Sequence, residues 1–192
     1  METRETQILK VAVELFGSQG YDRTSLQDIA DVVGITKPAL YYYFRDKDAL
    51  YARVVVQGLS QLVEYVQNRV EALSEPEARV HEFILSAATF LEENRSTWLL
   101  ASHGFWAATD GPLRGEALAL RDKFESLLRT SLSDAVATGS LREIDVALAG
   151  RLILSGLNQI HRWHSPTGSL TVVQVAERYL DFVLNGLRMP SR

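Results

Sequence analysis

Cysteine is absent from this chain of 192 residues, and proline occurs only five times. The absence of cysteine excludes disulfides, thiolate metal sites and redox sensing by thiols. No run of about 18 uncharged apolar residues occurs, so no membrane-spanning helix is predicted. The opening residues, METRETQILK, lack the apolar core of a secretion signal. We therefore expect a cytoplasmic protein without membrane contact.

The chain also has no excess of positive charge, because its formal net charge is −4 and its pI is about 5.6. This argues against a general nucleic-acid coat protein, but it says little about a local contact. Residues 36–47 contain Lys37, Arg45 and Lys47 against one acid, Asp46, which gives a local charge of 3 − 1 = +2. A small basic segment therefore interrupts an acidic chain.

Apolar residues recur at spacings of three and four between the few prolines, and the intervening segments are rich in Ala, Leu, Glu and Arg. This pattern predicts an all-α protein without a strand pair. The expected helices are 3–18, 25–33, 36–45, 46–73, 77–94, 96–108, 113–138, 145–164 and 170–187. Ser25 with Asp28 is a variant of the capping box. Thr36 can cap the third helix, and Pro38 suits its first turn.

Three consecutive tyrosines followed by Phe44 mark the third predicted helix. Leu40 and Phe44 are four residues apart and share the inward face, so Tyr42 is expected to point outward. Two short helices joined by a glycine-containing turn follow the helix-turn-helix plan. An exposed aromatic on a basic helix suits the major groove of DNA. The alternative is a structural turn whose tyrosines merely cover core edges.

Residues 8–50 resemble the DNA-binding head of the TetR family of transcriptional repressors. The resemblance is carried by these positions: Ala12, Phe16, Gly20, Tyr21, Thr24, Ser25, Ile29, Ala30, Gly34, Ile35, Leu40, Tyr41, Tyr43, Phe44 and Lys47. It implies a three-helix head over residues 1–46 and a helical body for ligand binding and dimerisation over 47–192. The protein would then be no enzyme, but a homodimeric repressor that binds a palindromic double-stranded operator.

The resemblance also implies roles for individual residues of the head. The residues expected at base edges are Thr36, Lys37, Pro38 and Tyr42. Those expected at phosphates are Thr24, Tyr41, Tyr43 and Lys47, which fix the register without reading sequence. Residue 43 is often His in the family, and Tyr43 keeps a hydrogen-bond donor there.

The body is rich in aromatic residues, which predicts a pocket for a hydrophobic effector. The resemblance places these around the pocket: Phe83, Phe90, Trp98, Phe105, Trp106 and Phe124. The string LNQIHRWHSPTGSL, residues 157–170, resembles TetR-type regulators of fatty-acid and sterol catabolism, which respond to acyl-CoA thioesters. We expect Asn158, Arg162 and Trp163 to contact such an effector, because CoA is polyanionic and carries an adenine ring. A structural role at the dimer interface is the alternative for Arg162 and Trp163.

Other interpretations remain open at this stage. A TetR-type regulator of multidrug efflux would sense cationic aromatic compounds, and a helical lipid-binding or adaptor protein would use the head to bind protein. A small helical hydrolase is a further interpretation, but the sequence contains no nucleophile motif. His161 and His164 could share a helical face, but a third metal ligand is not obvious, so neither a metal nor a cofactor is expected. Small residues in 145–164 and the amphipathic 170–187 predict a four-helix dimer interface.

Overall fold

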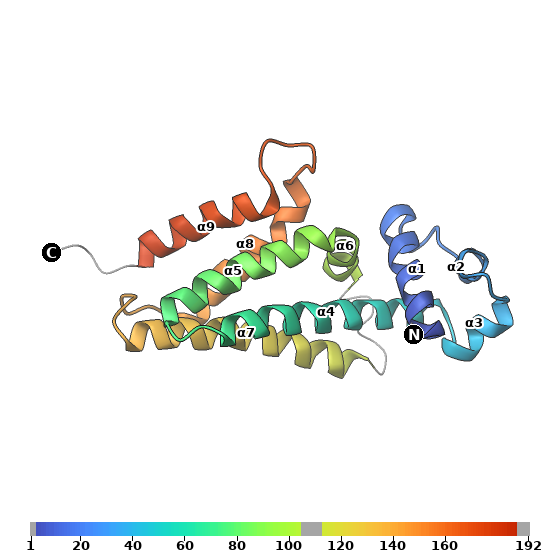
Figure 1. The fold of residues 1–192 in the computed structure, drawn as a ribbon, viewed down its shortest axis with the longest axis horizontal. Coiled ribbons are helices and arrows are strands. Elements are labelled where there is room, and N and C mark those ends of the chain that lie inside the picture. The colour runs from blue at the N-terminus through green and yellow to red at the C-terminus, as the bar shows by residue number, and fades with distance from the viewer. Residues whose placement is uncertain (1–2, 105–112, 188–192) are drawn as a thin grey trace. The chain divides into compact units, whose positions relative to one another are not determined.

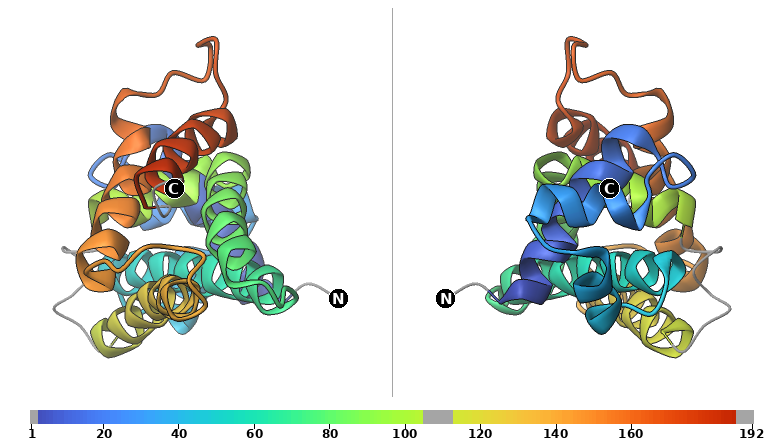
Figure 2. Two further views of the ribbon diagram at one scale, coloured as in Figure 1. Left: turned by 90° about the vertical axis from the view of Figure 1, so that its left-hand side faces the viewer. Right: turned by 90° about the vertical axis from the view of Figure 1, so that its right-hand side faces the viewer.

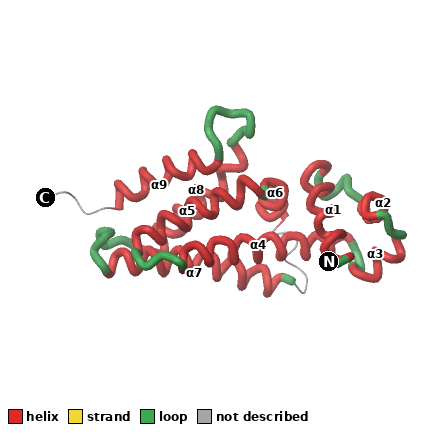
Figure 3. The backbone as a smooth tube through the Cα atoms, in the orientation of Figure 1, coloured by secondary structure: helices red, strands yellow, loops and turns green. Residues whose placement is uncertain are grey.

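The computed structural model describes residues 3–104 and 113–187, and the regular structure within these ranges is entirely helical (Figure 3). Figure 1 labels the helices along the chain. They are α1 (Arg4–Gln19), α2 (Leu26–Val33), α3 (Lys37–Tyr43), α4 (Lys47–Glu71), α5 (Pro76–Glu93), α6 (Arg95–Gly104), α7 (Arg114–Ala137), α8 (Val146–Trp163) and α9 (Val172–Leu187). The predicted all-α class is confirmed. The predicted bounds agree with these to within two residues, apart from the end of the helix over 96–108, where 105–108 lie outside the described residues.

The chain divides into two compact units that each contain separate stretches of sequence. The first unit comprises Met1–Ser60 and Asn94–Leu120, and the second comprises Gln61–Glu93 and Arg121–Arg192. Helix α4 therefore contributes its first half to one unit and its second half to the other. This division groups α6 with the head, so it differs from the predicted domains 1–46 and 47–192, which stay a prediction.

The core of the first unit is built from the apolar stripes of α1, α2, α3 and the start of α4. Its fully buried side chains include Ile8, Phe16, Ile29, Leu40 and Leu50. Helix α6 packs against α1 in the same unit. Gly58 of α4 permits a close approach of α6, because a Cβ at this position would overlap Cγ2 of Thr97. The three-helix head thus rests on α4 and α6.

The second unit is a bundle in which α9 packs on α5 and α8, as the end-on views in Figure 2 show. Helix α5 buries Val80, Phe83 and Ile84, and α9 buries Ala176 and Leu180.

Helix α9 begins at a capping box. The Thr171 N–H donates to Oε1 of Gln174 at 3.0 Å, and the Gln174 N–H donates to Oγ1 of Thr171 at 3.1 Å. Because Thr171 is the capping residue, the helix begins at Val172, two residues later than the sequence predicted.

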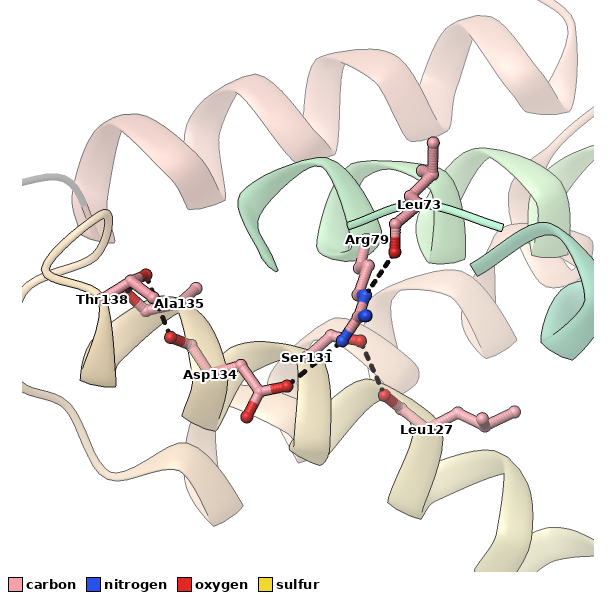
Figure 4. A network of polar contacts seen from close by, with 7 residues as sticks. All are labelled: Leu73, Arg79, Leu127, Ser131, Asp134, Ala135 and Thr138. Atoms are coloured by element: carbon pink, nitrogen blue, oxygen red, sulfur yellow. Dashed lines mark hydrogen bonds and ion pairs between the residues drawn. The ribbon is translucent and has the colours of Figure 1, made fainter. Parts of the chain in front are cut away.

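A polar network joins the α4–α5 turn, α5 and α7 within the second unit (Figure 4). Nε of Arg79 donates to the carbonyl of Leu73 at 2.8 Å, and the same guanidinium meets a carboxylate oxygen of Asp134 at 3.3 Å. Along α7, hydroxyls of Ser131 and Thr138 donate to carbonyls four residues back. One arginine therefore holds the turn after α4 against the last part of α7.

Candidate functional site

The helix-turn-helix of the first unit is fixed by local signals at each of its ends. Ser25 and Asp28 form a complete capping box at the start of α2, with Oγ of Ser25 accepting from the Asp28 N–H and the Asp28 carboxylate accepting from the Ser25 N–H. The bond from the Ser25 N–H holds the pKa of the Asp28 carboxyl below its ordinary value. Gly34 ends α2 in the left-handed region at φ 74°, where glycine has no steric penalty. Oγ1 of Thr36 then caps α3 by accepting from the Ala39 N–H.

Helix α3 presents its tyrosines as the sequence predicted. Leu40 and Phe44 are buried in the core of the first unit, whereas Tyr42 is 86% exposed. Tyr41 and Tyr43 flank that outward position and are 46% and 40% exposed. The rings of Tyr42 and Tyr43 meet edge to face, with centroids 5.4 Å apart. The helix therefore offers three phenol hydroxyls on a surface that it does not use for packing.

Basic residues and the starts of two helices lie on either side of these tyrosines in the sequence. Lys37 and Pro38 are exposed in the first turn of α3, next to the capping residue Thr36. Arg45 pairs with Asp46 at 3.0 Å, and Oδ1 of Asp46 accepts from the Ala49 N–H at 2.7 Å, which caps α4. A helix N-terminus favours anions through its oriented N–H groups. The predicted base-edge residues Thr36, Lys37, Pro38 and Tyr42 are thus brought together on one accessible helix and its cap.

Two of the predicted phosphate contacts are engaged inside the head. Thr24 is buried, and its hydroxyl donates to the carbonyl of Gly20 at 2.9 Å. Nζ of Lys47 donates to the carbonyls of Tyr21 at 2.9 Å and Thr24 at 3.2 Å. The contacts of Thr24 and Lys47 with phosphates stay predictions, and the structure gives both side chains a role within the protein.

Tyr21 was not predicted as a functional residue, although it lies at the centre of these contacts. Its hydroxyl donates to Oδ1 of Asp48, and the ammonium of Lys47 lies 4.1 Å from its ring centroid. Burial raises the pKa of Tyr21 above its ordinary value, and the hydrogen bond to Asp48 and the charge of that carboxylate act in the same direction. The spacing of Tyr21 and Asp48 in sequence carries no signal for this bond, because 27 residues separate them.

The predicted aromatic pocket residues fall into both compact units. In the second unit, Phe90 packs on Tyr65 with centroids 5.5 Å apart, and Phe124 packs on Phe83 at 4.7 Å. Trp98 is buried in the first unit. Phe105 and Trp106 lie outside the described residues. Phe90 and Phe124 thus each pack on another aromatic ring of the second unit, and the shared pocket stays a prediction.

The predicted effector contacts on α8 are exposed. Asn158 and Arg162 lie at the surface of the second unit, and Trp163 is 55% exposed. The imidazoles in this segment contact main-chain carbonyls, since Nδ1 of His161 lies 2.6 Å from the carbonyl of Asn158 and Nε2 of His164 lies 2.7 Å from that of Leu170. These bonds orient the end of α8 and the connection that follows it.

Helices α8 and α9 expose large apolar side chains that the second unit does not cover. Leu148 and Leu152 are one turn apart on α8 and are 61% and 68% exposed, and Phe182 of α9 is 71% exposed. Gly156 of α8 lies against the Tyr179 ring, so the two helices pack closely. Exposed apolar side chains on neighbouring helices are typical of a protein interface.

The described residues offer little support for other kinds of site. Within 3–104 and 113–187, no three His, Asp or Glu side chains are grouped so as to hold a metal ion. None of the helices in this described part is both long and apolar enough to cross a membrane. An open depression in the second unit is lined by residues other than the predicted effector contacts, namely Leu73, Glu77, Ala78, His81, Glu82 and Leu184.

Comparison with known proteins agrees with this geometry. Residues 8–54 match the family of bacterial regulatory proteins called tetR, and residues 73–187 match the tetracyclin repressor-like C-terminal domain. The HTH-type transcriptional repressor KstR2 of Rhodococcus jostii is 31% identical over 97% of this chain and 92% of its own length. The crystal structure of the TetR family transcriptional regulator PfmR from Thermus thermophilus has a TM-score of 0.85 and 36% identity, covering 95% of this chain and 99% of PfmR.

A further similar structure is a complex of AibR with isovaleryl coenzyme A and operator DNA. It has a TM-score of 0.84 and 25% identity, and the match covers 94% of this chain and 97% of AibR. The two family matches together include the helix-turn-helix and more than half of the chain. The protein therefore belongs to the TetR family of bacterial transcriptional regulators.

Proposed function

We propose that this protein is a repressor that binds a palindromic operator as a homodimer and is released by an acyl-CoA. The observation that carries the DNA-binding part is α3, a capped helix that begins at the exposed Lys37 and exposes Tyr42. Tyr42 would meet a base edge or a thymine methyl together with Thr36, Lys37 and Pro38. Tyr41 and Tyr43 would hold phosphates on either side of the groove and fix the register.

Dimerisation through α8 and α9 is the second part of the proposal. Leu148, Leu152 and Phe182 offer an apolar surface to a second copy of the chain. A two-fold axis between two such helix pairs makes a four-helix interface and presents two equivalent heads. Two equivalent heads require two equivalent half-sites, so the operator is expected to be an inverted repeat.

Support for an acyl-CoA effector comes from a relative and from the chemistry of one segment. AibR, which shares the fold and 25% of its residues with this chain, binds isovaleryl coenzyme A. Arg162 and Trp163 place a guanidinium and an indole at the accessible end of α8. A guanidinium suits the phosphates of CoA, and an indole can stack on its adenine. The acyl chain would lie against the aromatic residues of the body.

Helix α4 is the element through which release would be coupled. It follows the recognition helix directly in sequence and contributes to both compact units, over about 37 Å at 1.5 Å per residue. Effector and operator would favour different arrangements of the dimer. Their binding free energies would then be linked reciprocally by about 1–3 kcal/mol.

The experiment begins with DNA selected by the purified protein from a random-sequence pool. Calorimetry on the free protein then compares palmitoyl-CoA, isovaleryl-CoA, free palmitic acid and a cationic aromatic dye. We expect heat from an acyl-CoA, a weaker response to the free acid and displacement of the selected DNA by the same acyl-CoA. Tight dye binding without heat from either acyl-CoA would overturn the effector assignment and favour a multidrug regulator.

Arg162→Met tests the CoA contact within this scheme. The variant is expected to weaken acyl-CoA binding at least several-fold, with operator affinity and dimerisation unchanged. Arg129→Met is the matched control, because Arg129 is an exposed arginine on α7 of the same unit. Equal responses of the two variants to acyl-CoA would remove Arg162 from the effector site.

A further inference from the structure

The two ends of the helix-turn-helix segment are tied to each other by four residues, Tyr21, Thr24, Lys47 and Asp48, here called the clasp. Lys47 is the first residue of α4, and its ammonium donates to the carbonyls of Tyr21 at 2.9 Å and Thr24 at 3.2 Å. Asp48 accepts the phenol hydrogen of Tyr21. Each of these bonds crosses from the start of α4 to the turn between α1 and α2.

The position of the clasp in the chain gives it a specific mechanical consequence. Helices α2 and α3, with their turn, occupy residues 26–43, between the two halves of the clasp. The polypeptide therefore leaves the clasp at Thr24, forms the helix-turn-helix of α2 and α3, and returns to the clasp at Lys47. A change in the clasp would therefore act on both ends of the helix-turn-helix, whereas loss of a single cap would act on one.

The clasp is anchored to the core of the first unit through the Tyr21 ring. This ring meets Phe16 at a centroid distance of 5.7 Å and Tyr51 at 4.8 Å, and the hydroxyl of Tyr51 donates to the carbonyl of Leu100 at 3.1 Å. The same ring also carries the ammonium of Lys47, 4.1 Å from its centroid. Lys47 is therefore held at the turn by two kinds of interaction. Its ammonium forms hydrogen bonds to carbonyls and is attracted to the Tyr21 ring.

We propose that Lys47 and Asp48 are positioning residues for sequence recognition by α3, acting through the Tyr21–Thr24 turn. The proposal rests on the proposed DNA-binding function. It differs from a phosphate contact by Lys47, because two of the three N–H groups of the ammonium are directed at carbonyls of the protein. A positioning residue changes how well operator and random DNA are distinguished, whereas a phosphate contact weakens both alike.

The salt dependence of binding separates the two roles of Lys47. Affinities for the selected operator and for random-sequence DNA are measured at several salt concentrations with the wild type and Lys47→Met. Positioning predicts an operator affinity about tenfold lower, a smaller loss on random DNA and an unchanged salt slope. A lost phosphate contact instead reduces the slope by about 0.9 and weakens both DNAs equally, which would overturn the positioning role of Lys47.

For Asp48→Ala, a positioning role and an effect of charge alone predict changes of operator affinity in opposite directions. Removal of a negative charge close to the proposed DNA surface strengthens binding if charge alone matters. The clasp predicts that operator affinity falls several-fold despite the more favourable charge. Asp22→Ala is the matched control, since Asp22 is an exposed acid in the turn between α1 and α2 and carries the same charge as Asp48. Tyr21→Phe removes the other partner of the bond while it keeps the ring and the net charge.

The bond between Tyr21 and Asp48 can be tested by itself, even where Lys47→Met fails to fold. Lower operator affinity in both Asp48→Ala and Tyr21→Phe, with little further loss in the double variant, supports the clasp because both changes break one bond. Asp48→Ala behaving like Asp22→Ala, with Tyr21→Phe unchanged, overturns it. Failure of the wild type to select any DNA would instead overturn the proposed function.

Discussion

The recognition helix and the α8–α9 pair both expose large side chains, but the chemistry of the two surfaces differs. Helix α3 exposes Tyr41, Tyr42 and Tyr43, and each carries a hydroxyl at the end of an apolar ring. The α8–α9 pair exposes Leu148, Leu152 and Phe182, which have no polar side-chain atoms. A hydroxyl can form a hydrogen bond with a base edge or a phosphate. Leucine and phenylalanine side chains are stabilised only by burial away from water. One surface thus suits a wet polyanion and the other suits a second protein surface.

The largest effect is expected from placing a charge on the apolar surface. If α8 and α9 form the proposed dimer interface, Phe182→Glu should raise the dimer dissociation constant about a hundredfold or more, because the interface would then bury a carboxylate in place of an aromatic ring. Analytical ultracentrifugation over a concentration series measures this directly. Phe182→Leu is the control and should remain a dimer. A Phe182→Glu dimer of wild-type strength would place the interface outside the α8–α9 pair.

A smaller but more selective effect is expected on α3. Tyr42→Ala should weaken operator binding by about 1–3 kcal/mol and binding to random DNA by less, because a base contact carries sequence information. Tyr42→Phe separates the ring from the hydroxyl and shows which of them meets the base. Fluorescence anisotropy with both DNAs gives the ratio of the two dissociation constants for each variant. Equal losses on the two DNAs would mean that Tyr42 holds a phosphate.

The capping box at the start of α2 should contribute to the free energy of unfolding without contacting DNA. Ser25→Ala removes the acceptor for the Asp28 N–H and should lower the free energy of unfolding by about 1 kcal/mol. Thermal or urea unfolding measures the change. Thr171→Ala removes the corresponding cap of α9 and serves as the comparison in the second unit. A Ser25→Ala protein as stable as wild type would show that the capping box is replaced by solvent.

The smallest expected effect is a difference in pH dependence between the capping box of α2, which contains Asp28, and that of α9, which contains Gln174. The pKa of Asp28 is lowered in the folded protein, so its contribution is present above the unfolded value of 3.8 and is lost as the pH falls through the folded pKa. Thr171 and Gln174 do not titrate. Hydrogen exchange should therefore show the Ser25 amide losing protection in acid while the Thr171 amide keeps its own. Asp28→Asn should remove this difference in pH dependence, and parallel behaviour of the two wild-type amides would contradict it.

Much of the head could be predicted because its signals are local. Ser25 with Asp28, Gly34 and Thr36 with Pro38 each act within one turn of the chain, and the structure has all of them where the sequence placed them. The outward position of Tyr42 followed from helical spacing alone. Such features need no knowledge of distant neighbours.

The rest depends on contacts between distant segments, which periodicity does not encode. The bond between Tyr21 and Asp48 spans 27 residues, and the turn that holds Tyr21 meets α4 only once the helices are packed. Lys47 was interpreted as a phosphate contact because its position matches the family, while its two carbonyl partners became visible only in the folded chain. Arg79 and Asp134 are 55 residues apart and gave no sign of their pairing.

Sequencing of DNA that the protein selects from a random pool, followed by native mass spectrometry of the protein on that DNA, tests whether the protein acts as a dimeric regulator. The proposal of a dimeric regulator predicts an inverted repeat, occupied by an even number of chains, and dissociation of the complex on addition of an acyl-CoA. It also predicts that Phe182→Glu no longer forms this complex at the same concentration. A single chain bound tightly to a site without two-fold symmetry would show that the protein does not act as a dimer on DNA.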